Sequence, residues 1–315
     1  MVTLASKRGC HSMLHQDFSK GVAFMLVSAT GLSLVGLFGK IFEGDVSLSA
    51  LVFFRFISAF FICLLFYFFI GEFKSKHKNL AILPNVIRAF CVLAAQYSFY
   101  YYIQHSSLMN GMALLNTGPM FIPVIERMLV GSRIGSSTWI SILVSFIGVL
   151  FILQPDSGIF SLTGLIGLSA GVFQAISQVM FGMNAKAENI ELSVLITFGL
   201  CSVIGLIPYL IFNKSLQVPL PDIKIFILLI LGLGVASLLN QFARAKAYRF
   251  SSPSRLAAFL YFSVILAGIY DWLIFKDPLN FLSCLGAFII ILGGVLKIVL
   301  RKKILQSSEK KTPFP

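Results

Sequence analysis

Residues 48–70 read LSALVFFRFISAFFICLLFYFFI, an apolar run whose single charged residue is Arg55. A helix of about 20 mostly apolar residues is long enough to cross the hydrocarbon core of a bilayer, so this run predicts a transmembrane helix. The whole 315-residue chain has the same character, with 57% hydrophobic residues, 12% charged residues and a mean hydropathy of +0.91. Soluble domains carry about 25% charged residues. The composition therefore excludes a soluble enzyme, a disordered protein and a secreted disulfide scaffold, and it predicts a polytopic membrane protein.

Further apolar runs follow along the chain, separated by clusters of charged and turn-forming residues. The clearest breaks are Glu72 through Asn79, Asn213 through Asp222 and Lys276 through Pro278. The pattern predicts an all-α membrane protein of ten transmembrane helices, with a cytoplasmic segment of residues 1–20 before them and a basic tail of residues 301–315 after them. The ten predicted spans lie near residues 21–39, 48–70, 83–104, 109–130, 138–154, 160–184, 193–212, 223–247, 252–275 and 281–300.

The basic residues indicate how these spans are oriented. An even number of spans places both termini on one side, and cytoplasmic loops of membrane proteins carry an excess of Lys and Arg. If the termini are cytoplasmic, 18 of the 25 basic residues fall on the cytoplasmic side and 4 in the outer loops. Residues 1–20 lack the apolar core of a signal peptide. The formal charge of +13 thus indicates membrane topology rather than nucleic-acid binding, and both termini are expected in the cytoplasm.

The two halves of the chain share residues at a nearly constant offset. Gln96 matches Gln241, 145 positions later. Because the offset persists through five predicted spans, an odd number, the second copy would enter the membrane in the opposite direction, as in the inverted repeats that support alternating access. The predicted units are a first repeat of residues 21–154 and a second of residues 160–300. Further matches at about this offset join Ser106-Ser107 to Ser251-Ser252, Ala113 to Ala258, Leu115 to Leu260, Glu126 to Asp271 and Gly148 to Gly293.

Residues 114–123, which read LLNTGPMFIP, resemble the fourth-span signature of the EamA-type permeases of the drug/metabolite transporter (DMT) superfamily. The likeness extends over about residues 21–300. It implies that the third, fourth, eighth and ninth spans, together with the first and sixth, border a central cavity. Other stretches similar to the family are Ala247–Arg249, Tyr261–Val264, Asp271–Pro278, Leu285–Ala287 and Gly293-Gly294.

The repeat and the resemblance together predict a secondary transporter that moves a small polar or zwitterionic metabolite, amino-acid-like or related, across a bacterial inner membrane. Export is favoured, and the alternative is uptake or exchange of a scavenged metabolite such as S-adenosylmethionine or a nucleotide-like solute. The expected partners are this small molecule and membrane lipids, without nucleic acid, in a monomer or homodimer. The chain has no HExxH motif and no CxxC spacing, so neither an enzyme nor a metal or other cofactor is expected.

The predicted midplane of the bundle offers amides and hydroxyls rather than carboxylates. Such groups suit a small polar or zwitterionic solute with aromatic or amide-bonding character. Gln174 and Gln178 are four residues apart and therefore share a helix face. The alternative is that these side chains form interhelical hydrogen bonds, worth about 0.6 kcal/mol each on average. The candidate substrate-binding residues are Gln96, Tyr97, Asn116, Thr117, Gln174, Gln178, Asn240, Gln241 and Tyr261.

Five ionisable residues within the predicted spans are the candidates for gating, because a charge inside a span is costly and marks a candidate for function. The repeat match between Glu126 and Asp271 motivates the hypothesis of two gates. Glu126 with Arg255 or Arg88 would close the cytoplasmic side. Asp271 with Arg55 would close the outer side. The alternative is that these residues anchor helix ends, with the arginines extending to the membrane surface.

Overall fold

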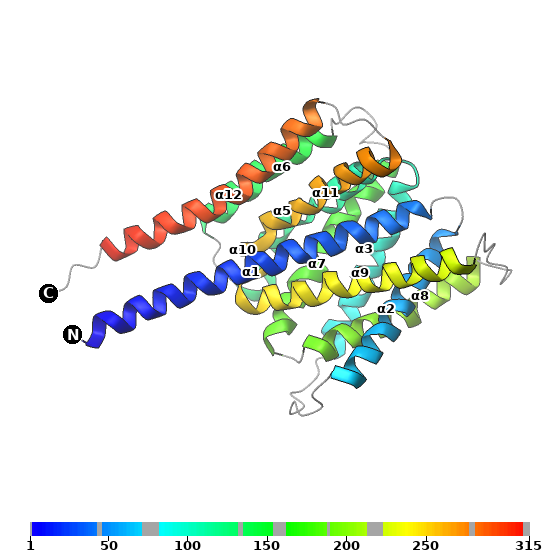
Figure 1. Cartoon of the computed structure of the whole chain (residues 1–315), viewed down its shortest axis with the longest axis horizontal. Coiled ribbons are helices and arrows are strands. Elements are labelled where there is room, and N and C mark those ends of the chain that lie inside the picture. Colours follow the sequence, from blue (N-terminus) through cyan, green and yellow to red (C-terminus); the bar gives the residue numbers. More distant parts are fainter. Residues whose placement is uncertain are drawn as a thin grey trace.

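The computed structural model of the chain describes residues 2–42, 46–70, 82–131, 135–153, 162–187, 190–212, 223–276 and 281–310. Every regular element within these ranges is helical. Figure 1 shows the helices packed side by side in a bundle, with the start of the first helix and the end of the last one extending from the same end.

The first half of the chain contains an interrupted helix, because a short helix ends at Leu115 and the next begins at Gly118. That second helix ends at Gly131, whose φ of 69° is a left-handed conformation that glycine adopts without strain. The elements of this half are α1 (Val2–Ile41), α2 (Leu48–Ile70), α3 (Ile82–Ile103), α4 (Leu108–Leu115), α5 (Gly118–Val130) and α6 (Ser136–Leu153).

The second half of the chain repeats this order, with its own interrupted helix in the corresponding place. Here the interruption is a 3₁₀ segment, η2, and the helix closes with a π-helical turn, η3. The elements of this half are α7 (Leu162–Ala187), α8 (Ile190–Phe212), α9 (Ile223–Phe250), α10 (Pro253–Leu256), η2 (Ala257–Tyr261), α11 (Phe262–Tyr270), η3 (Asp271–Phe275) and α12 (Phe281–Lys310).

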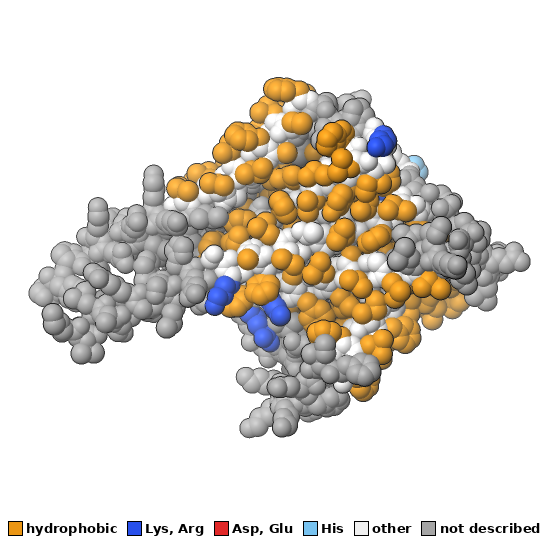
Figure 2. Space-filling model, in the orientation of Figure 1, with side chains coloured by type: hydrophobic (Ala, Val, Ile, Leu, Met, Phe, Trp, Pro, Cys, Tyr) orange, Lys and Arg blue, Asp and Glu red, His pale blue; other side chains and the backbone are white. Residues whose placement is uncertain are grey.

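Apolar side chains cover the outside of the bundle as well as its interior. Met128 on α5 is 79% exposed and Phe212 on α8 is 76% exposed. Figure 2 shows hydrophobic side chains across the visible face, with Lys and Arg near its margins. Water-soluble proteins rarely expose apolar patches of this extent, whereas lipid tails solvate them. The chain is therefore a multi-pass membrane protein.

The helices that match the predicted spans differ in length and in how apolar they are. The predicted spans near residues 83–104 and 223–247 coincide with α3 and α9, long helices that carry buried arginine and amide groups. Two shorter apolar stretches, Ser136–Phe151 and Cys284–Leu296, lie in α6 and α12. Six stretches are long and apolar enough to cross a bilayer, and these are Phe18–Ile41, Leu48–Phe66, Leu108–Val130, Leu162–Met183, Leu192–Phe212 and Pro253–Phe275.

The main helix contacts join the first half of the chain to the second: α1 packs on α9, α2 on α8, α3 on α7 and α6 on α12. Glycines bring these backbones together. A Cβ on Gly148 of α6 would lie 2.6 Å from the carbonyl oxygen of Gly286 in α12, and a Cβ on Gly31 of α1 would lie 2.6 Å from the backbone nitrogen of Asn240 in α9. Small residues allow close helix packing in membranes, where no hydrophobic force draws helices together.

Candidate functional site

The interrupted helices break the regular backbone hydrogen-bond ladder inside the bundle. In the first half, α4 gives way to α5 at Asn116 and Thr117, and Pro119 follows, which has no N–H to continue the ladder. The Thr117 hydroxyl donates to the carbonyl of Leu114 at 2.8 Å. In the second half, the segment that starts at Pro253 passes from α10 through η2 into α11. Such breaks are tolerated in membranes only where neighbouring groups satisfy the freed backbone.

Asn116 connects the two interrupted helices. Its Nδ2 donates to the carbonyl of Met112 at 2.7 Å and to the Ser263 hydroxyl at 2.8 Å. Ser263 in turn donates to the carbonyl of Leu260 at 2.7 Å. The Asn116 side chain is buried. This predicted site residue therefore lies where the two halves of the chain meet, and its amide bonds across that junction.

Two buried carboxylates each bind the interrupted helix of the other half. Oδ2 of Asp271 accepts a hydrogen bond from the backbone N–H of Met109 at 2.7 Å. Oε2 of Glu126 accepts one from the backbone N–H of Ser254 at 3.0 Å. The two acids are 145 positions apart, and so are the two donors, so the contacts correspond under the sequence repeat. We name them the reciprocal caps, because each satisfies an N–H in the first turn of a helix.

In this conformation of the described residues, the carboxylates and arginines of the two proposed gates are not paired with one another, and the gates stay a prediction. Among the described residues, the Glu126 carboxylate contacts neither Arg88 nor Arg255, and Arg255 is exposed. Likewise Asp271 does not contact Arg55, which donates to hydroxyl and amide groups instead. The sequence gives the depth of a residue in a span but not the direction in which its side chain leaves the helix. Residues at matching depths therefore face different neighbours.

One face of α9 is polar along its buried length. Counted from the first of them, the other four polar residues follow after three, four, seven and eleven positions, a spacing that places all five on one helix face. Each of them is at most 8% exposed. We name the first three the α9 polar turn. The five residues, in order, are Ser237, Asn240, Gln241, Arg244 and Tyr248.

Two buried arginines, one on α2 and one on α9 itself, donate to the α9 polar turn. Arg55 of α2 donates from Nε to the Ser237 hydroxyl at 3.1 Å and from a terminal nitrogen to Oε1 of Gln96. Arg244, one turn further along α9, donates to Oδ1 of Asn240 at 2.8 Å. Both guanidinium groups are thus held near the middle of α9.

A third arginine, Arg88 of α3, reaches the same turn. It donates to Oε1 of Gln241 at 3.2 Å and to the Thr197 hydroxyl at 3.0 Å. Its guanidinium carbon lies 3.5 Å from the ring centroid of Phe181, a cation–π contact. Since a helix rises 1.5 Å per residue, the three arginines meet α9 within about 6 Å along its axis.

The other predicted site residues lie on α3, α7 and η2. The Tyr248 hydroxyl donates to Oε1 of Gln178 at 2.7 Å, and Gln174 is buried one turn earlier on α7. The hydroxyl oxygens of Tyr97 and Tyr261 are buried and have no hydrogen-bond partner among the described residues. The predicted polar residues are therefore inside the bundle, but they form separate groups rather than one cluster.

Sequence reasoning missed Arg244, which the charged stretch Arg244–Arg249 placed at a helix end. In the structure α9 continues to Phe250, and Arg244 is buried at 3% exposure. Its spacing from Asn240 was the available signal, because residues four apart share a helix face. The other residues that were missed are Ser28, Thr197 and Ser237, which accept hydrogen bonds from the arginines, and Tyr248, which donates to Gln178.

Tyr248→Phe is expected to lower the stability of the folded protein by about 1 kcal/mol, because it leaves the buried Gln178 oxygen without its donor. The thermal unfolding midpoint of the purified protein measures this change. Tyr101→Phe, which removes a hydroxyl from a partly exposed ring on α3, is the matched control. Equal midpoints for the two variants would contradict the role of the Tyr248 hydroxyl.

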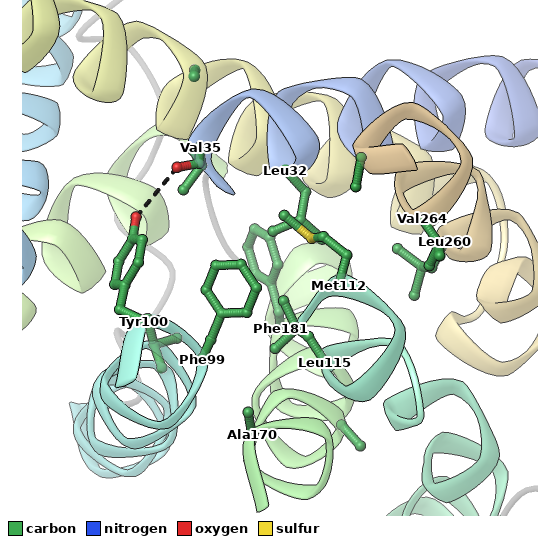
Figure 3. Close-up of a cluster of buried hydrophobic side chains, with 14 of the residues drawn as sticks. Leu32, Val35, Phe99, Tyr100, Met112, Leu115, Ala170, Phe181, Leu260 and Val264 are labelled. Carbon is green, nitrogen blue, oxygen red and sulfur yellow. Dashed lines mark hydrogen bonds between the residues drawn. The ribbon is translucent and has the colours of Figure 1, made fainter. Parts of the chain in front are cut away.

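Apolar side chains fill the space beside these polar groups. Figure 3 shows Phe99, Met112 and Phe181 together between α1, α3, α4 and α7, with Leu32 above them. All four side chains are buried. This packing fixes the helices that carry the arginines and Asn116, so the polar groups keep their mutual positions.

The site combines arginines, amides and hydroxyls on membrane helices from both halves of the chain, and the described residues include no cluster of His, Cys, Asp or Glu suited to a metal ion. An internal polar site between two membrane-embedded halves is typical of solute carriers. The EamA-like transporter family matches the chain twice, over residues 19–154 and 162–299. The chain belongs to this family, and it is a transporter of the DMT type rather than an enzyme.

Named relatives agree with this assignment. A riboflavin transporter of Vibrio cholerae is 29% identical over 187 residues, a match that covers 58% of this chain and 60% of that protein. A pseudopaline exporter of Pseudomonas aeruginosa is 25% identical over 199 residues, covering 62% of this chain and 68% of the exporter. A Helicobacter pylori transporter is 24% identical over 285 residues, or 88% and 93% of the two chains. One solved crystal structure superposes with a TM-score of 0.68 over 90% of this chain and 98% of its own, at 12% identity, which supports the fold.

Proposed function

We propose that the chain is a secondary transporter whose ten transmembrane helices form two inverted five-helix repeats, and that it moves a small polar or zwitterionic metabolite by alternating access. The observation that carries this proposal is the junction of the two interrupted helices at Asn116 and Ser263. Interrupted helices at the interface of repeats build the substrate sites of several transporter folds, and rocking of one repeat against the other changes which side has access.

The pattern of helix contacts supports two equivalent halves. When each element is exchanged for its counterpart in the other half, the pair α1–α9 becomes α7–α3, and α2–α8 and α6–α12 become themselves. The reciprocal caps correspond in the same way. A bundle with this internal symmetry has two equivalent ways to tilt its halves, as alternating access requires.

The proposed location is the bacterial inner membrane, with both termini in the cytoplasm. The excess of basic residues in the segments on that side supports this orientation. The α9 polar turn, at the middle of a helix of 28 residues, would then lie near the bilayer midplane.

The proposed direction of transport is outward. A pseudopaline exporter among the relatives supports export. A solute with a planar ring system is a second candidate class, supported by the riboflavin transporter among the relatives and by the aromatic rings beside the arginines. Uptake remains the alternative direction, and the experiment below distinguishes the two.

Asn116→Leu is expected to lower transport about tenfold or more, because leucine is similar in size but cannot donate to Ser263 and Met112. Untargeted mass spectrometry of cells that overproduce the wild-type chain or this variant would quantify solutes in medium and cytosol. A solute gained by the medium only with the wild-type chain identifies an exporter. A solute gained by the cytosol identifies an importer.

Gln104→Leu is the matched control, since it makes the same amide-to-apolar change at the end of α3, outside the junction of the interrupted helices. Both variants must reach the membrane at the wild-type level. A wild-type profile that equals that of cells without the chain would contradict the transporter proposal. If cells with Asn116→Leu showed the same solute profile as cells with the wild-type chain, the junction would not be important for transport. The transporter proposal itself would still stand.

A further inference from the structure

Buried positive and negative charges differ in how they are compensated in the described part of the chain. The buried Arg, Lys, Asp and Glu residues there are three arginines and two acids, each at most 6% exposed. Both acids are engaged in the reciprocal caps, where backbone N–H groups are their donors. The arginines gather instead around the α9 polar turn. The five residues are Arg55, Arg88, Arg244, Glu126 and Asp271.

Arg55 and Arg244 have neutral partners in the structure. Arg55 donates to one hydroxyl and one amide oxygen and lies over two aromatic rings. Arg244 donates to the Ser28 hydroxyl at 3.2 Å and to an amide oxygen. Neutral oxygens satisfy the N–H donors but bring no negative charge, and arginine stays protonated in proteins. Charged side chains inside membrane spans are costly and mark solute pathways.

The chemistry of these groups selects a ligand. A guanidinium is a planar fork of donors whose geometry matches two oxygens of a carboxylate or a phosphate. Three such forks meet α9 within about 6 Å along its axis, a span comparable to a small solute. The neutral oxygens that now accept from them are replaceable, because Gln96 and Asn240 are amides that gain nothing ionic from the contact.

We propose that the transported solute carries an oxyanion, a carboxylate or phosphate group, which binds between Arg55 and Arg244 at the α9 polar turn and replaces the amide oxygens there. This inference rests on the proposed function and names its substrate class. A bound oxyanion compensates the guanidinium charge, whereas a cation is repelled and a neutral solute leaves the charge as it was.

Binding to the purified, detergent-solubilised full-length protein tests this class. The thermal unfolding midpoint is measured with increasing succinate, citrate or inorganic phosphate, and with succinamide as the uncharged counterpart of succinate, all at one ionic strength. A ligand that binds only the folded state raises the midpoint in proportion to occupancy. The expected result is a saturable rise with at least one anion and no rise with succinamide. A response to phosphate alone assigns a phosphate-bearing solute, and a response to succinate or citrate assigns a carboxylate.

Matched variants locate the binding. Arg55→Gln and Arg244→Gln are each expected to weaken anion binding about 30-fold or more, because each removes one partner of a buried charge pair. Arg249→Gln removes an exposed arginine from the same helix and is expected to bind like the wild type. If a glutamine variant does not fold, Arg55→Lys and Arg244→Lys replace it, because lysine keeps the charge but lacks the forked donor geometry. The lysine variants are expected to bind the anion less tightly than the wild type but more tightly than the glutamine variants.

The outcomes separate this inference from the proposed function. The absence of a saturable rise with any of the three anions overturns the oxyanion class, as does an equal rise with succinamide or unchanged binding in both the Arg55 and Arg244 variants. Solute profiling that detects movement of an uncharged solute leaves the transporter proposal standing without the anion. Anion binding at the arginines, with no solute moved in cells, supports the anion site and contradicts transport.

Discussion

Asp271→Ala is expected to destabilise the folded protein, because the Asp271 carboxylate binds the interrupted helix of the other half. The buried N–H of Met109, in the first turn of α4, would lose its acceptor, at a cost of about 1–3 kcal/mol. The thermal unfolding midpoint and the fraction of monodisperse protein after purification measure the effect. Glu126→Ala is expected to act in the same way through Ser254, because the two contacts correspond under the repeat.

Amide variants separate hydrogen bonding from charge at these positions. Asp271→Asn and Glu126→Gln keep an acceptor oxygen near each N–H, so most of the stability is expected to remain. If the amide variants were as unstable as the alanine variants, the negative charge rather than the hydrogen bond would be the stabilising feature. A stable Glu126→Ala protein beside an unstable Asp271→Ala protein would contradict the equivalence of the reciprocal caps.

Gly148→Ala is expected to prevent the close approach of α6 and α12. The added methyl would lie 2.6 Å from the backbone oxygen of Gly286, so a helix must shift rather than a side chain. Overpacking of this kind costs about 1–3 kcal/mol, and the misplaced helix lowers the yield of folded protein. The measurement is again the unfolding midpoint, together with the yield of protein extracted from membranes.

Gly205→Ala provides the matched control within α8. A Cβ at Gly205 would meet only Cδ2 of Leu93, at an ordinary distance of 3.7 Å. Because alanine favours a helix over glycine by up to about 1 kcal/mol, this variant is expected to be as stable as the wild type or more stable. Gly148→Ala is therefore predicted to lower the stability of the folded protein, and Gly205→Ala to keep or raise it. A neutral Gly148→Ala protein would show that α6 and α12 pack less closely than the structure describes.

The class of protein could be predicted from the sequence because membrane insertion depends on composition and run length. The apolar run 48–70 and its equivalents predicted membrane helices, and the motif around Asn116 indicated the EamA family, which the family match confirmed. The repeat offset also pointed to a relationship between Glu126 and Asp271, and these two residues do make corresponding contacts. Local pattern and repetition were sufficient for these inferences.

The partners of the charged residues could not be predicted in this way. A carboxylate bound to a backbone N–H leaves no trace in side-chain identity at the donor, so Met109 and Ser254 carried no signal. The burial of Arg244 depends on how far α9 continues, and a basic stretch reads as a helix end whether or not the helix stops there. Arg55 and Gln96 are 41 positions apart, and only packing of α2 against α3 brings them together.

The reciprocal caps also constrain how the chain can be divided or can have arisen. Each half supplies the acid that completes the other half, so a fragment ending after α6 would hold a donor without its acceptor and an acid without its donor. If two copies of one such fragment faced each other across a twofold axis, the acid of each copy would accept from the backbone N–H of the other. This is the geometry expected of an ancestral homodimer. After fusion, only the acids stay under side-chain constraint. Because the donors are main-chain groups, the residues that carry them are free to diverge, as methionine and serine have here.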